Sequence, residues 1–194
     1  SMASHEFRTP LTSIVSTTDV ILKYRDKLSQ DNINLRLGKI KLDIEYMTVM
    51  LEDFLIIGKS ESQKLVYNSN ILDIVSLIKE LIDEYHLSES KNRPIIYNIS
   101  SPIIEVEADK KWIKHIVLNL HSNAIKYSEE DKPIEITIEK KQSGISFSFR
   151  DYGIGISEKN IKQLFEPFYR GENVGGIPGT GLGLTVLKKA VELH

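Results

Sequence analysis

Two groups of residues, far apart in the sequence, have the types and spacing needed for phosphoryl chemistry. The first centres on His5, within residues 4–11. A neutral imidazole has one donor and one acceptor nitrogen, so an acidic neighbour that holds Nδ1–H leaves Nε2 free to attack. Glu6 follows His5 directly and is the candidate for that role, and Thr9 comes one helical turn later. We therefore predict that His5 is a nucleophile with Glu6 beside it.

The second group begins with three polar side chains on one predicted helix. Asn119, Asn123 and Lys126 are four and three residues apart, which places two amides and an ammonium on one helical face. Such a face suits Mg²⁺ and phosphate oxygens, because Mg²⁺ takes oxygen ligands and bridges phosphates. Taken alone, the two asparagines are better explained as solvated residues near a helix end. The segments that follow favour the ligand interpretation.

Two glycine-rich segments complete the second group. Asp151 follows a predicted strand, where its carboxylate can accept a hydrogen bond from an adenine amino group, and Gly153 and Gly155 allow close approach of the backbone. Residues 179–183 open the last predicted helix, whose free N–H groups favour anions. Neither a Rossmann nor a Walker site fits, because there is no Gly-Lys-Ser/Thr ending and the glycines come after the helix that carries Asn119 and Asn123.

In this order, the segments resemble the conserved boxes of sensor histidine kinases. Residues 4–11 resemble the H box, 118–128 the N box, 151–156 the G1 box, 164–171 the F box and 179–184 the G2 box. The resemblance implies an ATP-binding set, with Asn123 as the main metal ligand and Asn119 as a supporting one. The implied ATP-binding residues are Asn119, Asn123, Lys126, Tyr127, Asp151, Gly153, Gly155, Arg170, Gly179, Thr180, Gly181, Leu182 and Gly183.

The resemblance also implies the activity, its cofactors and its partner. It implies an ATP- and Mg²⁺-dependent protein-histidine kinase that phosphorylates His5 and passes the phosphoryl group to an aspartate of a response-regulator receiver domain. Thr9 stands where this family often has Thr or Asn, which orient a water for removal of phosphate from the regulator. His121 stands where the family more often has an apolar residue, and we interpret it as a neighbour of the site rather than a ligand.

The N-terminal part predicts a helical hairpin. Its apolar positions recur at alternating steps of three and four, which is typical of a bundle seam. We expect helices over residues 4–28 and 31–62, with Ser29 or Asp31 as a cap between them. Two helices cannot enclose this seam, so two hairpins should form a homodimeric four-helix bundle. The seam positions are Phe7, Leu11, Ile14, Thr18, Ile21, Leu28, Leu37, Ile40, Ile44, Met47, Leu51 and Phe54.

After residue 62 the pattern changes to short strands alternating with helices. Such runs predict an α+β sandwich over residues 63–194, following the hairpin domain of residues 1–62. Residues 165–180 are read as a mobile lid, anchored by Phe165 and Phe168. The predicted strands are 65–71, 95–99, 134–140 and 145–150, and the predicted helices are 73–87 and a helix capped by Asp109 that runs to Lys126.

Composition excludes several other classes of function. The 194 residues carry a net charge of −2 with basic and acidic residues mixed, so no nucleic-acid partner is expected. The absence of cysteine excludes disulfides and thiolate metal sites. No apolar run reaches the roughly 20 residues that span a bilayer, so we expect no membrane contact by this chain. We expect a cytoplasmic location, either alone or as the cytoplasmic part of a membrane-anchored sensor. The chain starts on a motif and ends in a predicted helix without the family's two final strands, which predicts a fragment.

Two rival functions share part of this pattern. ATP-driven clamps such as type II topoisomerases and heat-shock chaperones have the same nucleotide fold, but there the position of Asn119 is typically a glutamate that activates water. An asparagine cannot act as that base. A dimeric interaction module with an inactive ATPase domain is disfavoured because Asn123, Asp151 and the glycines are intact.

Overall fold

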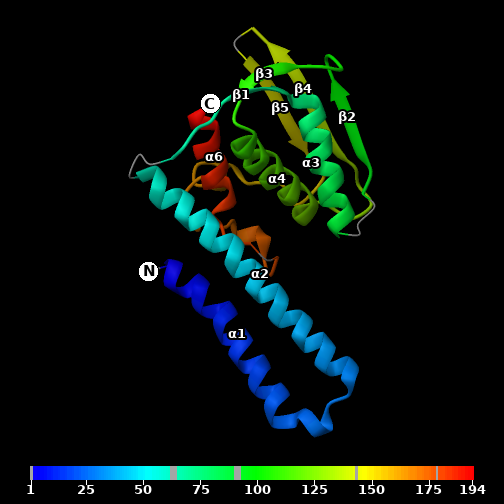
Figure 1. The fold of residues 1–194 in the computed structure, drawn as a ribbon, viewed down its shortest axis with the longest axis vertical. Coiled ribbons are helices and arrows are strands. Elements are labelled where there is room, and N and C mark those ends of the chain that lie inside the picture. The colour runs from blue at the N-terminus through cyan, green and yellow to red at the C-terminus, as the bar shows by residue number, and fades with distance from the viewer. Residues whose placement is uncertain (1, 62–64, 90–92, 143, 178) are drawn as a thin grey trace. The chain divides into compact units, whose positions relative to one another are not determined.

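A computed structural model describes residues 2–61, 65–89, 93–142, 144–177 and 179–194 (Figure 1). The chain forms two compact units, Ser1–Glu61 and Ser62–His194. None of the described helices is long and apolar enough to cross a membrane.

The first unit is a helical hairpin, as predicted. Helix α1 spans Met2–Tyr24 and is followed by a 3₁₀ turn at Arg25–Lys27, and α2 spans Gln30–Glu61. The Ser29 hydroxyl accepts a hydrogen bond from the Asn32 N–H at 3.3 Å and so caps α2. Asp31, the other predicted cap, lies inside the first turn of α2.

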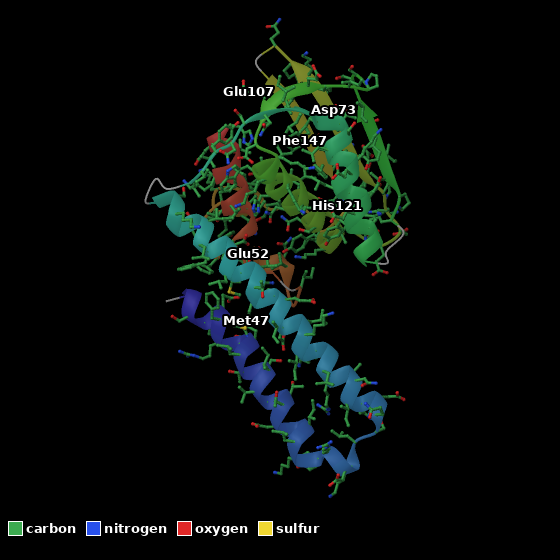
Figure 2. The ribbon with its side chains drawn as sticks, in the orientation of Figure 1. Met47, Glu52, Asp73, Glu107, His121 and Phe147 are labelled. Atoms are coloured by element: carbon green, nitrogen blue, oxygen red, sulfur yellow. The ribbon has the colours of Figure 1, made fainter. Side chains whose placement is uncertain are left out.

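The apolar positions of α2 divide between two faces. One face packs on α1: the rings of Phe7 and Phe54 meet edge-to-face with centroids 6.4 Å apart, and Met47 is half-buried (Figure 2). The second face stays open, because Leu37, Ile44 and Leu51 are 51%, 51% and 50% exposed. A single hairpin therefore covers only part of the predicted seam.

The described residues of the second unit form five strands in two sheets. Strand β1 (Asn70–Asp73) pairs antiparallel with β3 (Glu105–Ala108). In the larger sheet, β4 (Ile134–Lys141) lies between β2 (Ile95–Ile99), its parallel neighbour, and β5 (Gly144–Arg150), its antiparallel one.

Helices cover one face of the larger sheet (Figure 1). These are α3 (Ile74–Glu89) and α4 (Lys110–Tyr127). Helix α6 (Gly183–Leu193) packs on α4, and a short α5 spans Glu158–Ile161. The core side of β4 consists of isoleucines at every second position, which are fully buried at 134, 136 and 138. The predicted α+β sandwich is confirmed.

Asp109 caps α4 as predicted, and its contacts help to explain why the first strand starts later than predicted. Its carboxylate accepts hydrogen bonds from the N–H groups of Lys111 and Trp112. The predicted strand at 65–71 begins only at Asn70, because backbone groups before it bond to α4 instead. The Asn68 N–H donates to Asp109 Oδ2 at 2.7 Å, and Trp112 Nε1 donates to the Val66 carbonyl at 3.0 Å.

Candidate phosphoacceptor and nucleotide sites

His5 lies in the first turns of α1 with its imidazole in solvent. Its side chain is 76% exposed, and Nδ1 lies 3.8 Å from Oε1 of Glu6. The arrangement leaves Nε2 accessible to an incoming electrophile. The exposure follows from the sequence, because His5 lies off the Phe7 seam that faces α2.

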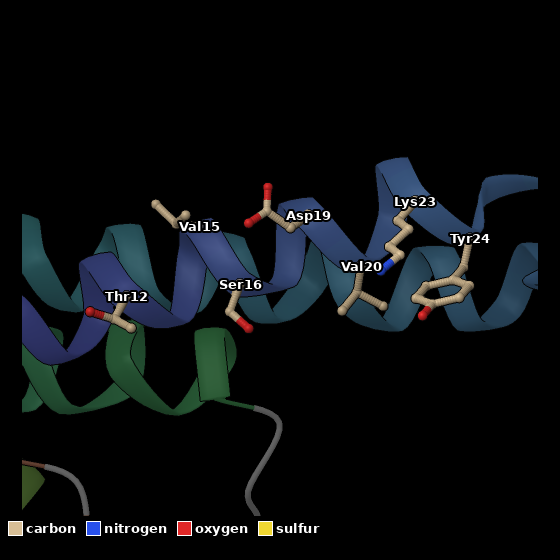
Figure 3. Close-up of a pocket in the computed structure, with 7 residues that line it drawn as sticks. All are labelled: Thr12, Val15, Ser16, Asp19, Val20, Lys23 and Tyr24. Carbon is tan, nitrogen blue, oxygen red and sulfur yellow. The ribbon is translucent and has the colours of Figure 1, made fainter.

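Thr9 lies one turn after His5 on the same helical face. Its hydroxyl donates to the His5 carbonyl at 3.2 Å and is exposed, so the oxygen can still accept from water. This face continues along α1, because Thr12, Ser16 and Asp19 follow at steps of three and four. A groove of about 400 Å³ lies there (Figure 3). Its lining residues are Thr12, Val15, Ser16, Asp19, Val20, Lys23 and Tyr24.

Asn119 and Asn123 differ in what their amides contact on α4. Asn119 Nδ2 donates to the His115 carbonyl at 2.9 Å, and its Oδ1 lies against Gly183, where an added Cβ would be 2.2 Å away. The Asn123 carboxamide is half-buried and has no hydrogen-bond partner among the described residues. Asn123 is therefore the better placed of the two to offer an amide oxygen.

These residues fit a magnesium ion that arrives with a nucleotide. The described residues contain no group of three or more His, Cys, Asp or Glu side chains that could hold a metal by themselves. Mg²⁺ is commonly held by one or two protein ligands together with substrate phosphates and water. One free amide on Asn123, with the exposed Lys126 three residues later, matches that coordination.

The turn after β5 is tied to the end of α4. The Gly153 N–H donates to Asp151 Oδ1 at 2.9 Å, which orients an exposed carboxylate. The Ile154 N–H donates to the Tyr127 carbonyl at 3.2 Å. A Cβ on Gly153 would lie 2.0 Å from that carbonyl oxygen, and Gly155 has a φ of 66°. Asp151 and Tyr127, distant in sequence, thus lie in one site because two glycines permit the contact.

The glycine-rich segment before α6 also meets this site. Gly181 has a φ of 68°, and an added Cβ would lie 2.7 Å from the backbone of Phe168. The Phe168 N–H donates to the Gly181 carbonyl at 3.0 Å, and the Leu182 N–H donates to Thr180 Oγ1 at 3.1 Å. A Cβ on Gly179 would lie 3.6 Å from the Tyr127 hydroxyl. The start of α6, which has no side-chain cap among the described residues, therefore lies beside Asn119 and Tyr127.

The predicted lid is held by several contacts. Asn173 Nδ2 donates to the Gly155 carbonyl at 3.0 Å, and the Arg170 guanidinium donates to the Ile177 carbonyl. Arg170, which the resemblance assigned to ATP binding, thus contacts its own loop. Phe165 does not anchor the lid through its ring, which is 43% exposed; instead its carbonyl accepts from the Thr185 hydroxyl at 3.1 Å. Residue 178, within the predicted lid, lies outside the described residues.

His121 is enclosed in the core, which sequence reasoning missed (Figure 2). It is 0% exposed, its ring stacks on His86 at 5.2 Å and meets Tyr85 edge-to-face at 5.2 Å, and neither nitrogen has a partner among the described residues. Burial, followed by the charges of His86 and Arg93, lowers the pKa of His121 to about 4. The ring is therefore neutral at pH 7. The sequence did hold a signal for this burial: His121 lies two residues from both Asn119 and Asn123, which places it on the opposite face of α4.

Comparisons with known proteins agree with this geometry. Residues 1–63 match the His Kinase A (phospho-acceptor) domain, and residues 108–194 match the histidine kinase-, DNA gyrase B- and HSP90-like ATPase family. Sensor histidine kinase YvrG of Bacillus subtilis is 28% identical over 193 residues, which are 98% of this chain and 33% of YvrG. The chain spans 32–41% of the length of three such curated relatives.

Solved structures show the same fold. Acinetobacter baumannii histidine kinase AdeS matches with a TM-score of 0.73 and 23% identity, covering 97% of this chain and 86% of AdeS. Histidine kinase ThkA, in complex with the response regulator protein TrrA, matches with a TM-score of 0.68 and 24% identity over 87% of this chain and 49% of ThkA. With both family models matched on one chain, in the order that the site residues require, this protein belongs to the sensor histidine kinases and is a two-component histidine kinase catalytic core.

Proposed function

We propose that this chain transfers the γ-phosphoryl group of ATP to His5 and then to an aspartate of a response-regulator receiver domain. One observation carries the proposal: a solvent-facing imidazole with a carboxylate 3.8 Å from Nδ1 lies on the same chain as a nucleotide-type site. When Glu6 closes on Nδ1–H, the Nε2 lone pair attacks the γ-phosphorus, the bond to the bridging oxygen breaks, ADP leaves, and the Nδ1 proton passes to the Glu6 carboxylate. The phosphoramidate formed is labile enough to pass its phosphoryl group onward.

The nucleotide-binding roles follow the arrangement of the second unit. Asp151, oriented by the Gly153 N–H, accepts from the adenine amino group. Asn123, whose carboxamide has no hydrogen-bond partner among the described residues, offers its amide oxygen to Mg²⁺. Mg²⁺ when bound neutralises phosphate charge, which is most of what phosphoryl transfer needs. The remaining proposed contacts are Asn119 to the metal, and Lys126, Tyr127, Gly153, Gly155, Arg170, Gly179, Thr180, Gly181, Leu182 and Gly183 to the nucleotide.

Transfer to a histidine is favoured over hydrolysis by water. The Asn119 amide donates to the His115 carbonyl and has no group that accepts a proton from water. A clamp-type ATPase needs a carboxylate at that position. The proposed reaction uses ATP, so we place it in the cytoplasm.

The proposed partners contact the first unit. A receiver domain must bring its aspartate to His5, and the groove on α1 continues the His5 face (Figure 3). The response-regulator complex of ThkA supports this kind of partner. A second hairpin covers the half-exposed Leu37, Ile44 and Leu51, which makes the protein a homodimer.

Thr9 gives the protein a second activity, removal of phosphate from the regulator. Its exposed hydroxyl lies one turn from His5 and can orient a water in line with the acyl phosphate. Thr9→Ala should leave phosphorylation of His5 unchanged and slow the loss of phosphate from the regulator. A variant that dephosphorylates its regulator as fast as the parent would remove Thr9 from the mechanism.

Labelling with radioactive ATP tests the proposed function. The parent protein with Mg²⁺ should take up acid-labile, base-stable label, and His5→Gln should take up none while still binding nucleotide. Label that persists on His86, His115 or His121 in the His5→Gln variant would contradict the assignment.

A further inference from the structure

The loop after Phe168 is held by hydrogen bonds at its base and at its start. We call residues 169–177 the strap. At its base, Phe168 and Gly181 are joined by a backbone hydrogen bond of 3.0 Å. At its start, the Tyr169 hydroxyl donates to Oδ1 of the buried Asn160 at 2.9 Å. These ties leave the central part of the strap, around Glu172–Val174, as the part whose position needs a further contact.

Asn173 supplies that contact with a single side chain. Its Nδ2 donates to the Gly155 carbonyl at 3.0 Å and to the Ile154 carbonyl at 3.4 Å. Both carbonyls belong to the turn that starts at Asp151, and the positive φ of Gly155 sets their direction. The amide is a suitable group because its two N–H donors can serve two neighbouring carbonyls, whereas a carboxylate cannot donate at all.

The strap also carries Arg170. The guanidinium donates to the Ile177 carbonyl across the strap, and its Nε is buried without a partner among the described residues. Arg170 and the far side of the strap are therefore linked. A change in how the strap docks on the Asp151 turn changes where Arg170 is held.

We propose that Asn173 is a positioning residue that latches the strap onto the Asp151 turn, so that the nucleotide bound at this turn is retained by the strap. The inference rests on the proposed binding of adenine by Asp151. The exposed ion pair between Lys159 and Glu172, at 3.0 Å, is a second link to the strap, but both side chains lie in water, where such pairs contribute little. The latch is therefore assigned to Asn173 alone.

The test compares matched variants of the whole chain. Asn173→Ala removes the two donors, and Asn173→Asp keeps the shape but replaces the donors with acceptors. Asn70→Ala is the control, because Asn70 Nδ2 also donates to a backbone carbonyl, that of Asn68 at 3.4 Å, but on β1. The measurements are the release rate of N-methylanthraniloyl-ADP, the KM for ATP, the kcat of autophosphorylation and the melting temperature.

Both Asn173 variants should release the fluorescent ADP about fivefold faster and show a KM raised to match, which corresponds to about 1 kcal/mol for one lost hydrogen bond. Their kcat at saturating ATP and melting temperature should equal those of Asn70→Ala and the parent. Parental release rates and KM in both Asn173 variants, while Asp151→Asn loses affinity, would overturn the latch alone. Parental affinity in Asp151→Asn would instead overturn the adenine assignment on which the latch rests.

Discussion

Replacing Gly153 with alanine should separate the Asp151 turn from the end of α4 and weaken the proposed binding of ATP. The new Cβ would lie 2.0 Å from the Tyr127 carbonyl oxygen, and ordinary contact begins at 3.4 Å, so the two backbones must move apart by about 1.4 Å. Two hydrogen bonds cross the same junction and would break: the Ile154 N–H donates to the Tyr127 carbonyl at 3.2 Å, and the Tyr152 N–H donates to the Ser128 hydroxyl at 3.3 Å.

The cost follows from these contacts. Two hydrogen bonds at about 1 kcal/mol each, with about 1–3 kcal/mol for overpacking, give about 3–5 kcal/mol of lost stability if the domain holds together. If the turn detaches locally instead, Asp151 leaves its place. ATP affinity then falls about tenfold or more, because a hydrogen bond to a charged group is worth about 1.5–3 kcal/mol.

Urea unfolding and calorimetric titration with Mg-ATP measure the two effects of Gly153→Ala. Gly176→Ala is the matched control, because Gly176 has no atom within 4 Å of an added Cβ and should behave as the parent. A Gly153→Ala protein with parental stability and parental ATP affinity would refute the reasoning.

Four further variants have expected outcomes. Asp151→Asn and Asn123→Ala should each weaken Mg-ATP binding in calorimetry without lowering the melting temperature, and unchanged affinity in both would contradict the site. Ile44→Asp with Leu51→Asp should give monomers or unfolded hairpins in light scattering, because each apolar side chain is worth roughly 1.5–3 kcal/mol when buried; a retained dimer would place the interface elsewhere. The pKa of His121 is lowered to about 4 from an ordinary 6.5. The contribution of this neutral side chain to the free energy of unfolding is therefore complete above pH 6.5, and up to about 3 kcal/mol of it is lost as the pH drops toward 4. His121→Leu should remove this part of the acid sensitivity in urea titrations at pH 7.5 and 5, and equal acid sensitivity in both proteins would contradict it.

Much of the fold was predictable because the local patterns are strong. The alternating isoleucines of β4 and the cap at Asp109 are local signals, and both are confirmed. The first strand was placed too early because the Val66 carbonyl and the Asn68 N–H bond to side chains of α4, a tertiary contact that strand propensity cannot reveal. Strand β3 was missed because two of its four residues are glutamates, which alternate with Val106 and Ala108 and leave little hydrophobic signal.

The spacing of residues predicted which side chains could share the candidate site, but it could not predict their contacts. Spacing indicated that Asn119 and Asn123 share a face of α4, yet only the structure shows that Asn119 is already engaged by Gly183 and His115. The latch by Asn173 had no signal in the sequence, since a single asparagine in a glycine-rich loop is ordinary turn chemistry. The contact exists only because folding brings the Ile154 and Gly155 carbonyls within hydrogen-bond distance of Asn173.

Direct mapping of the phosphorylated residue is the sharpest test of the central claim. The protein is incubated with Mg-ATP, digested at neutral or alkaline pH and analysed by tandem mass spectrometry that preserves phosphoramidates. The expected result is one phosphoryl group, carried by the His5 imidazole. A phosphoryl group on any other residue, or none on a protein that binds Mg-ATP, would contradict it.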